Sequence, residues 1–441
     1  MADPAHALLE RLQPAFDALE PGADPVVRPS DRADFQVNGV LPLAKRLGRN
    51  PREVADEIVR TADLSGVATV EVAGPGFLNL TLEPALIASL TRQMAADDRL
   101  GVAPAVTPET VVVDYSAPNV AKEMHVGHIR TTIIGDALCR LLSHAGHRVI
   151  RENHVGDWGT QFGMLIEHLL DLGEDQAAHE LNVGDLDGFY RQARAVFTAS
   201  PEMQERARER VVKLQGGDPE TLRLWQVLVR ESAGYFQTVY DKLGVLLTGD
   251  DLRGESYYNP MLSSVVTDLE AKGLLVESEG AKVVFLDGYT NRLGEPQPLI
   301  IQNSQGGFNY ATTDLATIRD RVDNRGATLL LYVVGAPQSQ HLEMCFEVAR
   351  LAGWLVPPAR AVHIPFGNVL GPDRKMFKTR SGATVRLVEL LDEAVERAAT
   401  AVAEKNPDLG DQERAVVARA VGIGAVKYAD LSTDRVKDYV F

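Results

Sequence analysis

Residues 111–155 read VVVDYSAPNVAKEMHVGHIRTTIIGDALCRLLSHAGHRVIRENHV, and this stretch decides the fold. Its first six residues, 111–116, are a β-branched run typical of a buried strand. A polar loop follows, and then 128–146 has helical spacing and ends on Gly146, a helix stop signal. Residues 147–155 again have the pattern of a strand. Strand, loop, helix and strand form one unit of a parallel doubly wound sheet, so we predict an α/β fold.

The whole chain has 441 residues, a length that predicts roughly three domains. We expect a small α+β module at 1–105, followed by a Rossmann-like domain at 106–385 with a helical insertion at about 171–250. The remaining residues, 386–441, have a helical pattern. The stretch DRLGVAPAVTPE, with two prolines and a glycine, is the expected linker between the first two domains.

The composition is that of an ordinary globular protein, with 45% hydrophobic and 24% charged residues. No apolar run is long enough to cross a bilayer, and the N-terminal residues lack the pattern of a secretory signal, so we expect a cytoplasmic protein without a membrane partner. Cys139 and Cys345 are too few for a disulfide framework or a zinc cluster, and we expect no protein-bound metal. The net charge of −16 argues weakly against nucleic acid, because an acidic protein can still carry a local basic face.

The first chemical motif is His125-Val126-Gly127-His128, where the loop after the first strand meets the helix. A helix N-terminus presents unpaired backbone N–H groups and attracts anions. Gly127 would let a nucleotide approach the backbone, and the two imidazoles could donate to phosphate oxygens. Taken alone, a helix cap that happens to contain histidines is the better interpretation of this motif.

The second motif is Lys375-Met376-Phe377-Lys378-Thr379, which follows a strand candidate and lies between two glycines. Such a cluster of cations on a loop could hold the outer phosphates of ATP and stabilise the leaving pyrophosphate. Taken alone, a solvated basic turn is the better interpretation.

HVGH followed much later by KMFKT resembles the HIGH and KMSKS signatures of class I aminoacyl-tRNA synthetases, with the third and last letters of the second motif departing from the family form. Further blocks resemble the arginyl-tRNA synthetases in particular, over most of the chain from near Asp34 onward. These blocks are DYSAPNVAKEMHVGHIRTTIIGD, HVGDWGTQFGMLIEHL, LQGGDPETLRLW, GESYYNP, NYATTDLA, VGAPQSQH, FKTRSGATVRL and GAVKYADLS.

The resemblance implies an ATP-dependent ligase that activates arginine and transfers it to the 3′ end of arginine tRNA. A guanidinium presents a rigid fork of donors and is best met by carboxylates. The resemblance assigns five residues to the arginine pocket: Asp114 and Asp314 at the guanidinium, Asn119 toward the α-amino group, and Tyr310 and Gln338 along the wall. Asp114 stands where many family members have glutamate, so its reach is one methylene shorter.

For ATP, the resemblance implies contacts from the two motifs and from one further histidine. The expected ATP-binding residues are His125, Gly127, His128, Lys375, Lys378 and His341. His125, His128 and Lys378 would act on the reacting phosphates, with Lys122 as a second catalytic cation. Magnesium is implied by the triphosphate rather than by any ligand spacing in the chain.

The module at 1–105 resembles the family's additional domain, which approaches the elbow of tRNA. Phe35, Gln36 and Asn38 would then stack on and hydrogen-bond an unpaired base. The family continues beyond the last residue of this sequence into an anticodon-reading helical domain, so we expect 386–441 to be the beginning of that domain, in either a fragment of a longer gene product or a naturally shortened enzyme. We expect the protein to act as a monomer.

Three other classes of function are weighed against this one. An arginine-activating paralogue could deliver arginine to a small molecule or a carrier. A nucleotidyltransferase of the wider HxGH group would share HVGH but would have no reason to carry Asp114, Tyr310 and Asp314. A non-catalytic binding protein should have lost His125 or His128, which are both present.

Overall fold

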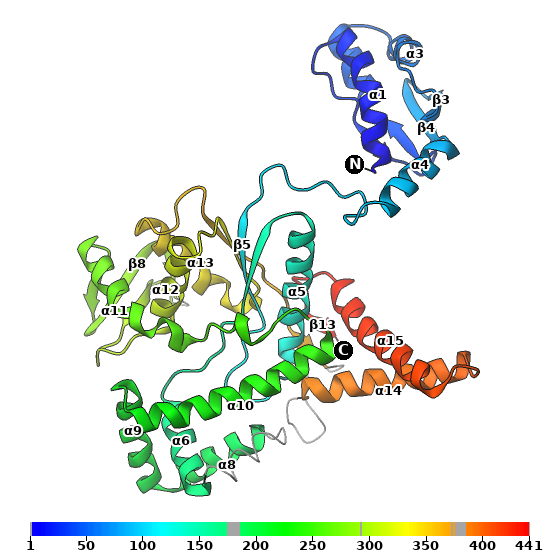
Figure 1. The fold of residues 1–441 in the computed structure, drawn as a ribbon. Helices are drawn as coiled ribbons and strands as arrows, with labels where there is room; N and C mark the ends of the chain where they lie inside the picture. The colour runs from blue at the N-terminus through cyan, green and yellow to red at the C-terminus, as the bar shows by residue number, and fades with distance from the viewer. Residues whose placement is uncertain (1, 174–185, 292, 372–373, 375–384, 441) are drawn as a thin grey trace. The chain divides into compact units, whose positions relative to one another are not determined.

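The computed structural model describes residues 2–173, 186–291, 293–371, 374 and 385–440 (Figure 1). The chain divides into two compact units, Met1–Val106 and Thr107–Phe441, and each is described by itself. In the part of the chain that the structure describes, no helix combines the length and the apolar character that crossing a membrane requires.

The first unit packs helices on a small antiparallel sheet of order β1-β2-β4-β3. Its core is aliphatic and includes Leu8, Leu43 and Ile58, all fully buried. The Asn50 side chain accepts from the backbone N–H of Arg52, which caps α3 as the sequence predicts. The elements are α1 (Pro4–Leu19), β1 (Val27–Pro29), β2 (Phe35–Val37), α2 (Val40–Leu47), α3 (Pro51–Thr61), β3 (Ala68–Ala73), β4 (Phe77–Leu82) and α4 (Pro84–Ala95).

The second unit is built on a four-stranded parallel sheet with many helices around it. Its strands are β5 (Thr110–Asp114), β6 (Arg148–Glu152), β10 (Leu329–Tyr332) and β11 (Arg360–His363). The helices are α5 (Ile129–His144), α6 (Gln161–Leu172), α8 (Leu186–Ala199), α9 (Pro201–Gln215), α10 (Pro219–Leu243), α11 (Glu255–Ala271), α12 (Tyr310–Asp323), α13 (Ser339–Leu351), α14 (Leu387–Lys405) and α15 (Asp411–Leu431).

The order of the parallel sheet is β11-β10-β5-β6, with every neighbouring pair parallel. The chain therefore moves from β5 outward to β6 on one side and from β10 outward to β11 on the other. Ligands of open α/β sheets bind where the strand order reverses, outside the carboxyl ends of the strands. In this protein the reversal lies between β5 and β10, and it confirms the predicted doubly wound α/β class.

Helices cover both faces of this sheet, so each strand is packed from two sides. Val111 and Val113 of β5 contribute to one core, which also contains side chains of α5, α10 and α14. Val112 points to the other core, with side chains of α11, α12 and α13. This alternation follows from the period of two residues in a strand.

Two strand candidates from the sequence lie outside the parallel sheet. AKVVFL and PLIIQ fall within β8 (Ala281–Thr290) and β9 (Pro296–Gln302), which pair antiparallel with β7 (Val276–Ser278) in a separate sheet. Strand propensity alone does not say which sheet a strand joins, since parallel and antiparallel strands share the same residue types.

Two further features complete the second unit. The short strands β12 (Val369–Leu370) and β13 (Tyr439–Val440) pair in parallel.

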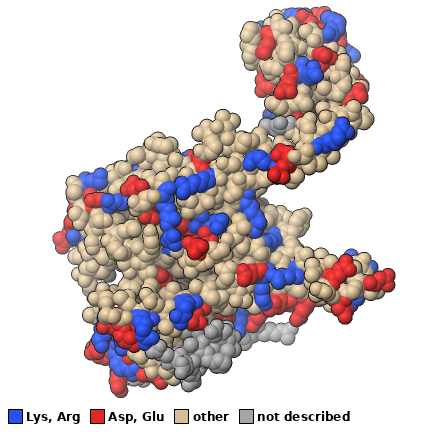
Figure 2. All heavy atoms as spheres, in the orientation of Figure 1, with Lys and Arg blue, Asp and Glu red and all other residues tan. Residues whose placement is uncertain are grey.

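On the face seen in Figure 2, basic and acidic side chains are interspersed, so the net charge of −16 is not gathered there into one acidic surface. The net charge therefore does not exclude contacts between phosphate and basic side chains on this face.

Candidate active site

The reversal point of the parallel sheet brings a carboxylate and a tyrosine side by side. Asp114 is the last residue of β5, and its partner across the strand pair is Tyr332, the last residue of β10. The Asp114 carbonyl accepts from the backbone N–H of Val333, which continues the ladder to the edge. Both side chains are buried, so any site at this edge has Asp114 and Tyr332 at its inner end, away from solvent.

The HVGH motif forms a 3₁₀ turn, Val126–His128, that leads directly into α5. The backbone N–H of Gly127 donates to His125 Nδ1 over 3.0 Å, and the backbone N–H of His125 donates to His128 Nδ1 over 3.1 Å. The ring centroids lie 4.1 Å apart. A Cβ at position 127 would lie 2.7 Å from the His125 ring, so only glycine fits this turn.

These bonds decide which nitrogen of each imidazole carries the proton. Burial lowers the pKa of both rings, that of His128 to about 3, with the charge of the neighbouring His125 adding to the effect on His128. Both rings are therefore neutral at pH 7. Because each Nδ1 accepts a backbone N–H, the proton lies on Nε2, and both rings can donate through Nε2 to a phosphate oxygen.

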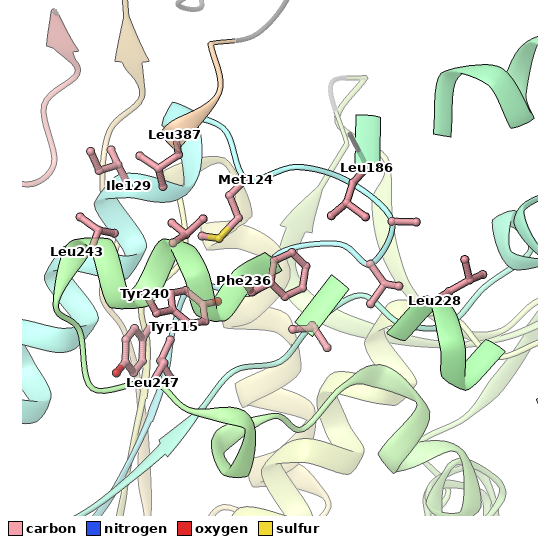
Figure 3. Close-up of a cluster of buried hydrophobic side chains, with 14 of the residues drawn as sticks. Tyr115, Met124, Ile129, Leu186, Leu228, Phe236, Tyr240, Leu243, Leu247 and Leu387 are labelled. Atoms are coloured by element: carbon pink, nitrogen blue, oxygen red, sulfur yellow. The ribbon is translucent and has the colours of Figure 1, made fainter. Parts of the chain in front are cut away.

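The segment that follows the second motif lies beside the first motif. Lys375 and Lys378 lie outside the described residues, but the segment that follows them returns along the HVGH loop. The backbone N–H of Val126 donates to the Val385 carbonyl, and that of Leu387 donates to the Met124 carbonyl. Met124 reaches into the same apolar cluster as Phe236, Tyr240 and Leu387 (Figure 3), which anchors the loop from below.

Lys122 lies at the entrance to the HVGH loop and packs against the insertion. Its Nζ lies 4.7 Å from the centroid of the Tyr190 ring on α8. The Lys122 charge also helps to lower the pKa of His125, after burial, while Asp187 acts in the opposite direction. The lysine is thus electrostatically close to the motif that it was predicted to assist.

Asp114, predicted to meet the substrate guanidinium, is paired with an arginine of the protein itself. Its Oδ2 accepts from Nη2 of Arg321 over 2.7 Å. Arg321 is fully buried, and its Nε donates to Glu152 Oε2 over 2.7 Å. Sequence reasoning missed Arg321, although it lies seven residues after Asp314 and therefore on the same face of a helix.

Asp314 lies on the second turn of α12, four residues after Tyr310, which is exposed. Its Oδ2 lies 2.5 Å from His341 Nε2. This bond raises the pKa of His341, against the effect of burial. His341, predicted to contact ATP, is thus bonded to a residue predicted for arginine.

Gln338, predicted for the wall of the arginine pocket, is exposed on the 3₁₀ turn that precedes α13. A cavity of about 330 Å³ is lined by Tyr310, His341, Gln297 and Met344, among others, and by no carboxylate. Burial raises the pKa of Glu255 to about 7, the charges of Asp157 and Asp314 add to this, and His154 opposes it.

Asn119 is exposed in the loop after β5 and forms a parallel bridge with Gly156, in the loop after β6. A Cβ at position 156 would lie 2.3 Å from Asn119 Oδ1. The Asn119 side chain can keep its orientation only if residue 156 is glycine.

Gly156→Ala is therefore expected to rotate the Asn119 amide out of place. If Asn119 binds the substrate α-amino group, loss of that charged hydrogen bond should raise KM for arginine about tenfold. Steady-state kinetics would measure it. Gly234→Ala in α10, where a Cβ meets nothing within 4 Å, is the control and should leave KM unchanged. Equal KM values for both variants would contradict this role of Asn119.

The three residues predicted for RNA lie together in the first unit. Phe35 and Gln36 belong to β2, and Asn38 follows it. The Gln36 amide donates to Asn79 Oδ1 over 2.8 Å, whereas Asn38 Oδ1 is buried and has no partner among the described residues.

Comparisons with known proteins cover nearly the whole chain. The family model "tRNA synthetases class I (R), catalytic domain" matches residues 90–441, and "Arginyl tRNA synthetase N terminal domain" matches 5–82. The arginine–tRNA ligase of Thermobifida fusca is 55% identical over 100% of this chain and 77% of its own length, and that of Escherichia coli K12 is 52% identical over 98% and 76%. The crystal structure of arginyl-tRNA synthetase from Plasmodium falciparum superposes with a TM-score of 0.76 at 25% identity, covering 99% of this chain and 76% of that one. The Thermus thermophilus arginyl-tRNA synthetase, at 23% identity and a TM-score of 0.71, supports the fold.

Proposed function

This chain belongs to the arginyl-tRNA synthetase family, and we propose that its carboxylates, histidines and lysines carry out that family's reaction in the roles given below. The activity is that of an arginine–tRNA ligase. It joins arginine to ATP as arginyl-adenylate with release of pyrophosphate, and then transfers the arginyl group to arginine tRNA.

In the first step the arginine carboxylate attacks the α-phosphorus of ATP, and pyrophosphate departs. Positioning and charge stabilisation dominate such a step. We propose that His125 and His128 donate through Nε2 to the phosphates at the N-terminus of α5, which their neutral state at pH 7 supports. Gly127 allows the nucleotide to approach the backbone closely. The negative charge of the departing pyrophosphate is stabilised by Lys375, Lys378 and Lys122.

Magnesium would enter with the nucleotide. Mg²⁺ prefers oxygen ligands and retains several waters. Among the described residues no three carboxylates converge within reach of one ion. We therefore assign it to the phosphates of ATP, with no protein ligand named.

The arginine side chain would extend to the carboxyl edge of the parallel sheet, with Asp114 and Asp314 at its guanidinium, Asn119 at its α-amino group, and Tyr310 and Gln338 along the wall. The observation that carries this assignment is a pair of carboxylates, Asp114 from β5 and Asp314 from α12, which both lie close enough to Tyr332 at the strand-order reversal to add to the rise in its pKa caused by burial. A site of this kind rejects an analogue that leaves its polar groups unpaired by about 10⁴–10⁵.

Lysine and citrulline are accordingly expected to be very poor substrates. Citrulline is neutral, and lysine has one nitrogen where arginine has a planar fork. Substrate-dependent ATP–pyrophosphate exchange, with arginine tRNA present, would measure both against arginine. Activation of either at a rate comparable to that of arginine would contradict the pocket.

The same exchange assay tests where the arginyl group goes. Exchange that depends on arginine tRNA, together with charging of that tRNA, is the result expected of the ligase. Exchange without RNA, and no charging, would favour a paralogue that transfers arginine to another acceptor.

In the second step we propose that the 2′-hydroxyl of the terminal ribose takes the arginyl group, as in class I enzymes. Phe35, Gln36 and Asn38 would bind an unpaired base near the tRNA elbow, as recognition of single-stranded RNA requires. We further propose that the enzyme acts as a monomer in the cytoplasm, where ATP and tRNA are supplied.

A further inference from the structure

Arg321 is a guanidinium that the protein itself places against the predicted substrate pocket. It is fully buried on α12, and its Cζ lies 4.9 Å from the centroid of the Tyr332 ring. It bridges two carboxylates from neighbouring strands, with Nη2 on Asp114 Oδ2 and Nε on Glu152 Oε2, each over 2.7 Å. No described residue donates to the other oxygen of Asp114, Oδ1.

The charges around Arg321 do not balance. Arg325 Nε lies 3.4 Å from Glu152 Oε1 and 3.6 Å from Asp320 Oδ2, which extends the cluster by one cation and one anion. The complete group has three carboxylates and two guanidinium groups: Asp114, Glu152, Asp320, Arg321 and Arg325. One further cation, bound at Asp114 Oδ1, would neutralise it, and burial makes such neutrality favourable.

Asp314, which lies on α12 like Arg321, is also held by the protein through one of its two carboxylate oxygens. His341 Nε2 lies 2.5 Å from its Oδ2, while no described residue donates to its Oδ1. Both carboxylates thus have one oxygen held by a cationic or cation-forming side chain of the protein. The oxygen that remains on each is Oδ1.

We propose that Arg321 and His341 are positioning residues of the arginine pocket, each holding the Oδ2 oxygen of one carboxylate so that the substrate guanidinium is received by the two Oδ1 oxygens. This inference rests on the proposed pocket of Asp114 and Asp314. One oxygen on β5 and one on α12 would each accept a hydrogen bond from one terminal nitrogen of arginine, so the pocket would select for the distance between these nitrogens. A lysine ammonium could reach only one of them, which would explain selectivity through spacing as well as charge.

The pocket should then respond to pH through His341. The ionisable groups that bear on this ring are Asp314 from α12 and Cys345, one turn along α13, whose Sγ lies 3.7 Å from Nε2. The charge of Asp314 also helps to raise the pKa of Glu255 at the start of α11, where burial has the largest effect. The Asp314 hydrogen bond raises the pKa of His341 above 6.5. Below that pKa the ring is charged and competes with the substrate cation, so KM for arginine should fall as the pH rises through it.

Arg321→Lys tests the bridge, because an ammonium keeps the charge but cannot span Asp114 and Glu152 in one fixed geometry. We expect KM for arginine to rise up to about 100-fold, the size of effect that a small misplacement produces, with KM for ATP unchanged. Arg319→Lys is the matched control, two residues away on the same helix, where Arg319 pairs with Asp268 at the surface. It should leave both KM values unaltered.

His341→Gln and His341→Ala test the second contact. The glutamine amide can still donate to Asp314 but does not titrate, so KM at high pH should stay within about threefold of wild type while its pH dependence flattens. Any dependence that remains is assigned to Glu255 and should disappear when Glu255→Gln is added. His341→Ala should raise KM about tenfold at high pH, where wild-type His341 is neutral, because the contact is lost, and the low-pH rise caused by the charged ring should be absent.

The outcomes separate this inference from the pocket on which it rests. If Asp314→Asn leaves KM for arginine unchanged, the pocket itself is wrong. If Asp314→Asn raises KM while Arg321→Lys and His341→Ala do not, or if His341→Gln keeps the full pH dependence, the pocket stands and the positioning roles are overturned.

Discussion

Asp314→Asn is expected to lower kcat/KM for arginine about 100- to 1000-fold while leaving KM for ATP near its wild-type value. The substitution keeps the shape of the side chain and removes the charge. Truncating one partner of a largely desolvated charge pair costs about 2–5 kcal/mol, and a loss of roughly 3–4 kcal/mol corresponds to this range. Steady-state aminoacylation with arginine, ATP and arginine tRNA varied in turn would measure it.

Asp323→Asn is the matched control for that substitution. Asp323 is the last residue of the same helix, is exposed, and lies 3.7 Å from Arg319. A surface pair of this kind contributes little to stability, so its loss should leave activity within twofold. Equal behaviour of the two variants, or an Asp314→Asn defect confined to ATP, would remove Asp314 from the arginine pocket.

The second large effect is on stability and concerns Arg130, immediately after the HVGH turn. Its Nε donates to Asp430 Oδ1 over 2.8 Å, and its Nη1 donates to the carbonyls of Gly367 and Lys437, each over 2.9 Å. The side chain is almost completely buried. Arg130→Ala leaves the Asp430 carboxylate buried without its cation and should cost about 3–5 kcal/mol. Thermal unfolding of the full chain should show a fall of several degrees in Tm.

A double substitution distinguishes the stability that comes from the Arg130–Asp430 ion pair from the cost of leaving Asp430 buried without a partner. Burial raises the pKa of Asp430, even though Arg130 opposes this, so an apolar pair should be tolerated better than a lone carboxylate. Arg130→Met with Asp430→Leu is therefore expected to recover most of the lost stability. Arg397→Ala on α14, where Arg397 and its partner Glu393 are both exposed, should cost less than about 1 kcal/mol. If Arg130→Ala were as mild as Arg397→Ala, the buried pair would be structurally unimportant.

Local patterns in the sequence were sufficient for much of the fold. The run VVVDYS, the helical spacing after HVGH and the strand pattern of HRVIRENHV correspond to β5, α5 and β6. Gly74-Pro75-Gly76 has the composition of a turn, and β3 and β4 pair antiparallel around it. These features depend on neighbours within a few residues, which is why periodicity and turn residues identify them.

The partners of the predicted site residues could not be obtained in the same way. Arg321 reaches Asp114 across 207 positions of the chain, and His341 reaches Asp314 from the next helix. An arginine in a charged helix looks like a solvated residue in sequence, because charged side chains are rarely fully buried. The separate sheet of β7, β8 and β9 was missed because strand propensity does not encode pairing.

The packing of β5 on both faces has a consequence for anyone who wishes to redesign this enzyme. Val111 and Val113 are enclosed by one core and Val112 by the other, so a change of side-chain volume along this strand would disturb two interiors at once. Altered amino-acid preference is more accessible from α12 and the turn before α13, where Tyr310 and Gln338 are exposed. A mutant library for new substrates should therefore randomise those two positions and leave the strand intact.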